Sequence, residues 1–587
     1  MSERNHLSDL LGHLTFLYGP ERAGTCFERL HQMLDAFLHE HPDLATMPIG
    51  GERLGEQDVV LITYGDQISE PERPPLQSLA EVLGGPWRGV VSAVHILPFY
   101  PYSSDDGFSV IDYTAVDPQL GDWGDIARLR AHARLMFDAV VNHISAESDW
   151  FQAFLRGEPG AQRRFIIMDP TTDLSQVTRP RTTPVLTRFE TAGGPRYIWT
   201  TFSADQIDLN FADPDLLLEI MEVLLGYVAH GAELIRLDAI GYLWKEVGTR
   251  CIHLPQTHQI VQLFRTALDI VAPGVLLITE TNVPHQDNIS YFGDGTNEAQ
   301  LVYQFPLAPL VLDAFATGSA RHLTEWASEL ETPSDTTTFF NFLASHDGIG
   351  VVPATGMLGP AAIAALAARA EAHGGHVSYK TNPDGSQGAY ELNITLFDAL
   401  SDPHDQTEPS GRKIDRFLCA NAIMLALQGV PGIYIHSLVG SHNYHAGVRA
   451  TGRFRSINRE KWDRAALERR LADPADSASM VFARMSALIG IRRGQRPFHP
   501  NGAQRVIASD DALFTLLRSS PDGREHVLCI HNVSDRPQNA RLERDSLPEL
   551  AGRPLRDLIS GRSLAAWHPG SELTAAPYQV LWLAAGA

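Results

Sequence analysis

Cysteine is scarce in this sequence, since only four of its 587 residues are cysteines. No two of them form a C-x-x-C pair or another spacing typical of metal ligands, which argues against a zinc site and against a disulfide framework. Four isolated thiols are most simply reduced and buried, as in a cytoplasmic protein. The four residues are Cys26, Cys251, Cys419 and Cys529.

Basic residues are also few: 47 lysines and arginines stand against 70 aspartates and glutamates, which makes the formal net charge −23. This charge argues against nucleic acid and anionic membranes as partners, because phosphate groups need a basic footprint. A small anionic substrate stays possible, since a few local arginines are enough to bind it.

Long apolar runs are absent as well. None reaches the roughly 18 residues that suggest a membrane span, and the N-terminus lacks the basic and then apolar segments of a signal peptide. We therefore expect a cytoplasmic protein with no membrane partner. The sequence leaves its oligomeric state open.

Eight short runs rich in β-branched and aromatic residues alternate with helical patterns along the chain. Such runs predict buried strands, and segments such as PDLLLEIMEVLLGYVAHG repeat apolar residues at helical spacing. Eight β/α units predict an α/β fold, a closed parallel (β/α)8 TIM barrel whose active site lies at the C-terminal strand ends. The predicted strands are 59–68, 91–99, 134–143, 233–240, 275–281, 301–306, 338–347 and 432–438.

Four segments fall outside this repeat. Residues 1–55 show helical spacing and predict a helical N-terminal extension. Residues 144–210, after the third strand, predict an inserted domain, and residues 348–412, after the seventh, predict a second insertion. From residue 505 to 587, short alternating runs predict a small all-β domain. The catalytic barrel then comprises residues 56–143 and 211–504.

Three acidic residues close the apolar runs of the fourth, fifth and seventh strands: Asp238, Glu280 and Asp347. Burial of an unpaired carboxylate is costly, so three of them at strand ends predict an active site. Arg236 lies two residues before Asp238 on the same side of its strand, where its guanidinium should hold that carboxylate ionised. Glu280 follows an apolar stretch with no cation beside it in the sequence, so its pKa could be raised into the range of a general acid.

Four segments in order, RLMFDAVVNH, ELIRLDAI, LLITET and FLASHD, resemble the signature segments of the α-amylase superfamily, glycoside hydrolase family 13. The resemblance covers roughly residues 55–500. It implies that Asp238 is the nucleophile, that Glu280 is the acid/base, and that Asp347 clamps sugar hydroxyls in the transition state. The residues that it places around the bound glucose ring are His143, Arg236 and His346.

Two further segments, LPFYPYSSDDGFSVIDYTAVDPQLGDWGD (97–125) and TRPRTTP, resemble the sucrose phosphorylase subgroup of that family. By this resemblance, Asp105 and Phe108 close around the glucose ring and Arg181 helps to hold phosphate, for which a forked guanidinium is suited. Tyr390, in GAYELN, matches a loop tyrosine that reaches phosphate; the alternative is an aromatic that merely covers the barrel mouth. The other matching positions near the acceptor and the glucose ring are Gln206 and Arg455, with Tyr242 stacking nearby.

One position departs from the sucrose phosphorylase pattern. Gly388 stands where those enzymes have an acidic residue that helps to bind fructose, which puts sucrose as the donor in doubt. With its N-terminal extension and its longer second insertion, the chain resembles glucosylglycerate phosphorylases most. These use inorganic phosphate to cleave 2-O-α-glucosyl-D-glycerate into α-glucose 1-phosphate and D-glycerate. The candidate readers of an anionic aglycone are Arg179, Arg181 and Arg188.

Three alternatives stay open: phosphorolysis of sucrose or sucrose 6′-phosphate, phosphorolysis of glucosylglycerol, and a plain α-glucosidase or transglucosidase. A non-catalytic member of the superfamily is disfavoured, because all three acids are present. Many amylases bind structural calcium through the asparagine equivalent to Asn142, whereas sucrose phosphorylases generally do without it. The resemblance therefore implies no metal, and no glycine-rich nucleotide-binding loop follows a strand, so we expect no cofactor.

Overall fold

The centre of the molecule is a closed barrel of eight parallel strands, which confirms the predicted fold class. The structure is a computed structural model, and it describes residues 3–46, 52–181, 183–381, 387–541, 547–568 and 572–585. Each predicted run overlaps one barrel strand, although β17 begins two residues before its predicted run, and the strands follow one another around the ring in chain order. They are β1 (Val60–Thr63), β3 (Ala93–Ile96), β4 (Arg134–Ala139), β10 (Ala232–Leu237), β11 (Leu276–Thr279), β12 (Leu301–Tyr303), β13 (Thr338–Asn341) and β17 (Val430–Tyr434).

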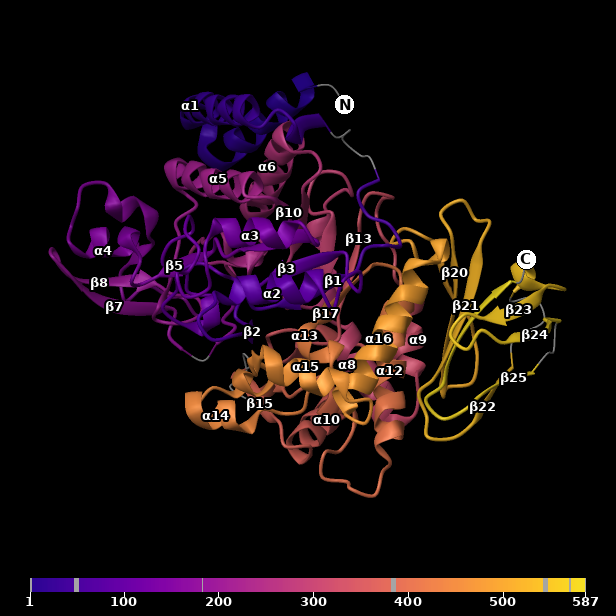
Figure 1. Cartoon of the computed structure of the whole chain (residues 1–587). Helices are drawn as coiled ribbons and strands as arrows, with labels where there is room; N and C mark the ends of the chain where they lie inside the picture. The colour runs from indigo at the N-terminus through magenta and orange to yellow at the C-terminus, as the bar shows by residue number, and fades with distance from the viewer. Residues whose placement is uncertain are drawn as a thin grey trace.

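Helices surround this barrel (Figure 1). The helix before β10 shows how the sequence sets its boundaries: Asp213 caps it by accepting hydrogen bonds from two backbone N–H groups, and Pro214 occupies the first turn. Both residue types are favoured there, because the first helical N–H groups lack partners within the helix. The main helices between strands are α2 (Pro75–Gly84), α3 (Trp123–Arg130), α5 (Pro214–Ala229), α6 (Pro255–Val271), α8 (Leu307–Thr317), α9 (Arg321–Ser328) and α12 (Ser410–Ala426), and α16 (Ser477–Arg493) follows β17.

The N-terminal segment forms α1 (Glu3–Glu40), which packs against α5 and α6 on the outside of the barrel (Figure 1). The helix is broken at Gly19, whose φ of 74° lies in the region that glycine tolerates best, and Pro20 follows it. Leu14 and Leu30, one on each side of the break, are fully buried. Both halves therefore contribute apolar side chains to the core.

Two insertions extend from the C-terminal ends of the strands. The first follows β4 and begins with a pair of antiparallel strands, β5 (His143–Ser145) and β9 (Gln206–Asp208). Beyond them lie α4 (Asp149–Leu155) and a sheet of β6 (Ile167–Met168), β8 (Gly194–Trp199) and β7 (Leu186–Thr191), which project away from the barrel (Figure 1). The second follows β13 and contains α10 (Pro360–Ala372) and the strands β14 (Ile349–Gly350), β16 (Gln387–Asn393) and β15 (His376–Thr381).

The C-terminal part is a separate stack of strands on the side of the barrel opposite the first insertion (Figure 1). A six-stranded sheet contains β19 (Gln504–Val506), β20 (Leu513–Ser519), β21 (His526–Asn532), β26 (Val580–Ala585), β23 (Pro554–Asp557) and β24 (Ser563–Ala566). A second sheet pairs β22 (Gln538–Arg541) with β25 (Glu572–Ala575). For the whole chain we propose four domains: the helical extension 1–55, the barrel 56–143 with 211–504, the inserted domain 144–210 and the all-β domain 505–587.

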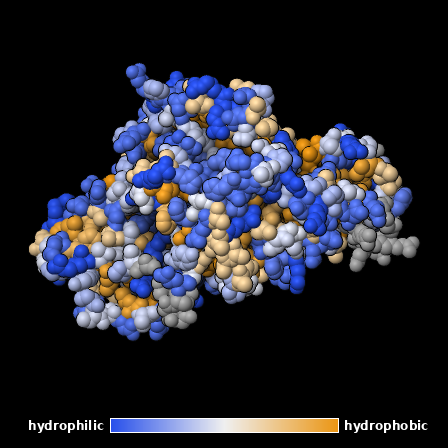
Figure 2. All heavy atoms as spheres, turned by 90° about the horizontal axis from the view of Figure 1, so that it is seen from below, coloured by the Kyte–Doolittle hydropathy of each residue, from blue (hydrophilic) through white to orange (hydrophobic). Residues whose placement is uncertain are grey.

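Hydrophilic residues cover most of the face in Figure 2, and the apolar residues on it form small separate groups. In the ranges given above, no helix combines the length and the apolar character needed to cross a lipid bilayer.

Candidate active site

Three acids meet around one arginine at the C-terminal ends of the barrel strands. Asp238 directly follows β10 and Glu280 directly follows β11. The Nη1 atom of Arg236 lies 2.7 Å from Oδ1 of Asp238, and its Nη2 atom lies 3.8 Å from Oε2 of Glu280. The sequence predicts Asp347 at the end of the seventh strand. In the structure β13 ends at Asn341, and Asp347 follows it after an irregular segment.

Two buried residues that the sequence analysis missed, Asp138 and His95, fix the position of Arg236. Asp138 on β4 forms a short ion pair with Nη1 of Arg236, and His95 on β3 bonds the other oxygen of Asp138 at 2.6 Å. All three side chains are almost completely buried. The sequence signal that could have indicated these two residues is an ionisable side chain within an apolar strand run: Asp138 in RLMFDAVVNH and His95 in VSAVHILPF. Strand pairing between β3, β4 and β10 joins them.

The environment of Glu280 suits a general acid. Burial, together with the negative charges of Asp238 and Asp347, raises the pKa of Glu280 to about 7, although Arg236 acts in the opposite direction. Its Oε2 atom accepts a hydrogen bond of 3.1 Å from the backbone N–H of Ala239. Ala239 has a φ of 49°, a conformation that non-glycine residues seldom adopt and that is often found next to active sites. The sequence showed no cation near Glu280, but the fold supplies Arg236.

Asp238 differs from the simple expectation for an arginine-paired carboxylate. Burial raises the pKa of Asp238 above its ordinary value, and the adjacent guanidinium of Arg236 only partly opposes this effect. The prediction that Arg236 holds this carboxylate ionised stays a prediction. Asp138 competes for the same guanidinium and places a second negative charge nearby, which adds to the effect of burial.

Asp347 lies among arginines. The Nη1 atom of Arg455 is 2.5 Å from Oδ1 of Asp347, and Nη2 of Arg459 is 3.9 Å from the same oxygen. Burial alone would raise the pKa of Asp347, but these guanidinium groups outweigh it and lower that pKa. Arg459, which the sequence analysis also missed, follows Arg455 by four residues and donates to the backbone carbonyl of His346 at 2.8 Å.

Aromatic and amide side chains line the space beside the acids. The rings of Phe108 and His346 stack, with centroids 4.6 Å apart. The Nε2 atoms of His143 and Gln206 each lie 2.9 Å from the backbone carbonyl of Phe108, so the segment after β3 is fixed to the first insertion. Burial and neighbouring arginines hold the pKa of His346 well below its ordinary value, which keeps the ring neutral. Asp105 lies in the short 3-10 turn Asp105–Gly107, just before this group.

Arg181, Tyr242 and Tyr390 form a second group beside the acids. Burial raises the pKa of Tyr390 to about 12, and the charge of Arg181 opposes that rise. The charge of the same arginine also opposes the burial-driven rise in the pKa of Tyr242 and contributes to lowering the pKa of Asp347, so its guanidinium lies within electrostatic reach of all three. Tyr390 lies on strand β16 rather than in a loop. The other two candidate arginines differ, because Arg179 is exposed and Arg188 forms a surface ion pair with Glu190.

An ammonium group lies beside Asn142, the position at which the family resemblance raised the question of calcium. Nζ of Lys245 donates to Oδ1 of Asn142 at 3.0 Å and forms an ion pair of 2.6 Å with Asp208. All three side chains are buried or nearly so, and no cluster with metal-binding character occurs in the part of the chain that the structure describes. A lysine thus supplies the positive charge between the barrel and its first insertion.

The barrel with this group of acids defines a carbohydrate-active enzyme of the α-amylase superfamily, and residues 89–369 match the family "Alpha amylase, catalytic domain". The chain is 51% identical to a glucosylglycerate phosphorylase of Allomeiothermus silvanus over 98% of both chains, and 46% identical to one of Escherichia coli over 90% of this chain and 92% of that one. It therefore belongs to the family of these phosphorylases. A sucrose phosphorylase of Agrobacterium vitis is more distant, with 31% identity over 78% of this chain and 92% of that one. The crystal structure of a sucrose 6F-phosphate phosphorylase from Thermoanaerobacter thermosaccharolyticum superposes with a TM-score of 0.70 at 25% identity, covering 81% of this chain and 94% of that one.

Proposed function

We infer that this enzyme is a retaining disaccharide phosphorylase. It cleaves 2-O-α-D-glucosyl-D-glycerate with inorganic phosphate, reversibly, and yields α-D-glucose 1-phosphate and D-glycerate. The observation that carries this assignment is the near full-length similarity to enzymes with the name glucosylglycerate phosphorylase. The arrangement of the acids supports the chemistry.

We assign the first step to Asp238 and Glu280. Asp238 attacks the anomeric carbon while Glu280, protonated because burial raises its pKa to about 7, donates its proton to the departing glycerate oxygen. The product of this step is a β-glucosyl ester of Asp238. Arg236 contacts both carboxyl groups and is oriented by Asp138. It can therefore balance the negative charge that passes between them.

Phosphate is the acceptor in the second step. Glu280, now ionised, takes a proton from phosphate, whose oxygen attacks the anomeric carbon of the glucosyl ester and releases the carboxylate of Asp238. Two inversions leave the α configuration unchanged. We assign the phosphate contacts to Arg181 and Tyr390, which lie close enough for the guanidinium charge to oppose the rise in the tyrosine pKa that burial causes. Asp347 is assigned to the sugar hydroxyls, with Asp105, Phe108, His143, His346 and Arg455 around the glucose ring and with Gln206 and Tyr242 toward the acceptor.

A basic residue opposite Gly388 supports an anionic aglycone. Gly388 pairs across the sheet with Lys380, a half-buried residue whose pKa is lowered by burial. An acidic side chain at position 388 would neutralise that amine, so glycine preserves the positive charge. Of the candidate arginines, Arg181 is the one within electrostatic reach of the site.

Two measurements test the assignment. Donor cleavage is followed with and without phosphate, and the appearance of glucose 1-phosphate or free glucose is recorded. We expect phosphate to accelerate cleavage and glucose 1-phosphate to be the product; a rate independent of phosphate would instead identify a glucosidase. In the synthetic direction, glucose 1-phosphate is offered with D-glycerate, glycerol, fructose or fructose 6-phosphate. Preference for any acceptor other than glycerate would overturn the substrate assignment and leave the phosphorylase mechanism in place.

Replacing Asp238 with Asn should abolish turnover with every acceptor, because the amide cannot form the glucosyl ester.

We also propose that the enzyme works in the cytoplasm. All four cysteines are free and buried, which supports a reducing compartment.

A further inference from the structure

A cavity of about 420 Å³ opens at the N-terminal end of the barrel, opposite the active site. Leu276, the first residue of β11, lines it, whereas Glu280 follows the last residue of the same strand. At about 3.3 Å per residue these two residues lie roughly 13 Å apart along the strand. The cavity is therefore separate from the candidate catalytic site, on a face of the barrel that normally contributes to stability rather than catalysis.

Two buried arginines line this cavity and share one carboxylate. Arg53 and Arg265 have side chains that are only 7% and 6% exposed. Nε of Arg265 lies 2.7 Å from Asp269, and Nη2 of Arg53 lies 3.5 Å from the other oxygen of the same carboxylate. Asp269 itself does not line the cavity. Two positive charges thus share one negative charge beside the cavity.

The hydrogen-bonding capacity of Arg53 is also incompletely used. Its Nε atom is buried and has no hydrogen-bond partner among the described residues. Burying a charged donor without a partner is costly, and such groups normally bind a counter-charge, a water molecule or a ligand. The adjacent charge of Arg265 and burial both lower the pKa of Arg53, which is the response expected of a cation short of negative charge.

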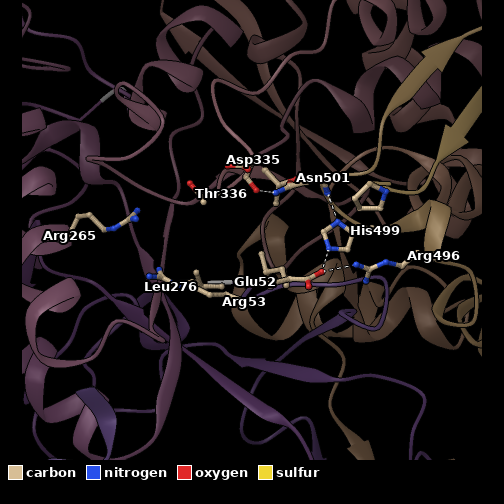
Figure 3. Close-up of a pocket in the computed structure, with 12 residues that line it drawn as sticks. Glu52, Arg53, Arg265, Leu276, Asp335, Thr336, Arg496, His499 and Asn501 are labelled. Atoms are coloured by element: carbon tan, nitrogen blue, oxygen red, sulfur yellow. Dashed lines mark hydrogen bonds and ion pairs between the residues drawn. The ribbon is translucent and has the colours of Figure 1, made fainter. Parts of the chain in front are cut away.

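The other charged residues of the lining are Arg496, Glu52 and Asp335, so the lining as a whole carries three arginines and two carboxylates (Figure 3). Glu52 accepts from Arg496 at 3.1 Å and from His499 at 2.7 Å. The carboxylate of Asp335 is exposed at the rim. Oδ1 of Asn501 is buried and lacks a hydrogen-bond partner in the described part of the chain. In Figure 3 the labelled side chains come from several sides and leave the space between them open.

We propose that this cavity is a binding site for a small oxyanion, namely the phosphate or carboxylate group of a small metabolite, with Arg53 and Arg265 as its cationic contacts. The anion lies against the guanidinium groups of Arg53 and Arg265 and offsets the excess positive charge of the lining. The polar side chains of Thr336 and Asn501 face the uncharged part of the ligand. The cavity volume of about 420 Å³ is in the range of sites for small molecules.

Equilibrium dialysis with radiolabelled inorganic phosphate tests this site in the full-length protein. We expect the wild type to bind two phosphates per chain, one in each site, and the Arg53→Gln variant to bind one while keeping its catalytic rate. The Arg181→Ala variant, altered in the proposed catalytic phosphate site, should keep the phosphate bound near Arg53. Displacement of that phosphate by D-glycerate or by glucose 1-phosphate distinguishes a carboxylate from a phosphate ester as the preferred ligand. An unchanged stoichiometry in Arg53→Gln, or a single site in the wild type, would overturn the proposal.

A pair of milder variants covers the case in which Arg53→Gln does not fold. Asn501→Asp adds a negative charge to the lining and should weaken phosphate binding at this site at least tenfold. Asp335→Asn removes a negative charge from the rim and should strengthen it. Identical affinities in both variants and the wild type would contradict an anion site. Because these residues lie far from the acids, a failure here would leave the proposed phosphorolysis untouched.

Discussion

Arg455 and Glu391 form a forked ion pair in which Nε and Nη2 of the arginine donate to the two carboxylate oxygens at 2.9 and 2.8 Å. The third nitrogen of the same guanidinium lies 2.5 Å from Asp347. Glu391 comes from the insertion after the seventh barrel strand and Arg455 from the segment after the eighth. This pair therefore connects strand β16 of the second insertion and the segment after β17 to the third acid.

The first prediction concerns this connection. Glu391→Gln should leave the protein folded but lower kcat/KM by up to about 100-fold, because a neutral amide no longer fixes the guanidinium that positions Asp347. Steady-state phosphorolysis measures the loss. Glu325→Gln is the matched control, since it breaks an exposed pair with Arg321, and such pairs contribute little. Equal effects of the two variants would show that Glu391 has no positioning role.

The second prediction concerns the pH dependence of catalysis. Because the pKa of Glu280 is about 7 and the protonated form is the acid, kcat/KM for donor cleavage should fall as pH rises above about 7. Glu280→Gln should lose this alkaline limb together with most activity on glucosylglycerate. It should still form the glucosyl ester from α-glucosyl fluoride, whose leaving group needs no protonation. Failure with both donors would argue against an acid role.

The third prediction uses the same residue as a probe of stability. The pKa of Glu280 is raised in the folded protein from 4.5 to about 7, so folding favours its protonated form. The stability that this preference contributes is present below pH 4.5 and is lost as pH rises through about 7. The neutral Glu280→Gln variant escapes that loss. Its Tm relative to the wild type should increase between these two pH values and then level off; a pH-independent difference would contradict the raised pKa.

The fourth prediction concerns Lys245 and Asp208, which are 4% and 0% exposed. Lys245→Met should destabilise the protein by about 3–5 kcal/mol, because it leaves a buried carboxylate without its counter-charge. Denaturant unfolding measures the change. The double variant Lys245→Met/Asp208→Asn should recover part of the loss, since both charges are then removed. A double variant no more stable than the single one would show that the pair does not interact as described.

The fifth prediction concerns acceptor choice at Gly388. Gly388→Asp places a carboxylate opposite Lys380 and should lower the rate with D-glycerate relative to fructose by about tenfold or more, because it cancels positive charge near the anionic acceptor. Phosphate release from glucose 1-phosphate reports both rates. Gly388→Asn has a similar size without the charge and serves as the control. If both variants shifted the preference equally, charge would not be the cause.

The barrel could be predicted from the sequence because its signals are local. Eight short β-branched and aromatic runs each form a barrel strand, since alternation and apolar content decide which segments become buried strands. Asp238 and Glu280 could be located for the same reason, as each directly follows such a run. Asp347 was located less well, because the turn between the end of β13 and the acid has no periodic pattern.

The tertiary structure alone decided which distant charges meet. Nothing local in the sequence indicates that His95 and Asp138 support Arg236, that Lys245 reaches Asp208, or that Glu391 binds Arg455, because each pair is joined by strand neighbours or by loops far apart in the chain. Electrostatic energy depends on distance in space and on burial, and a sequence supplies neither. For this reason the three acids were predictable as a group. Arg459 beside Asp347 and the cavity at the opposite end of the barrel were not.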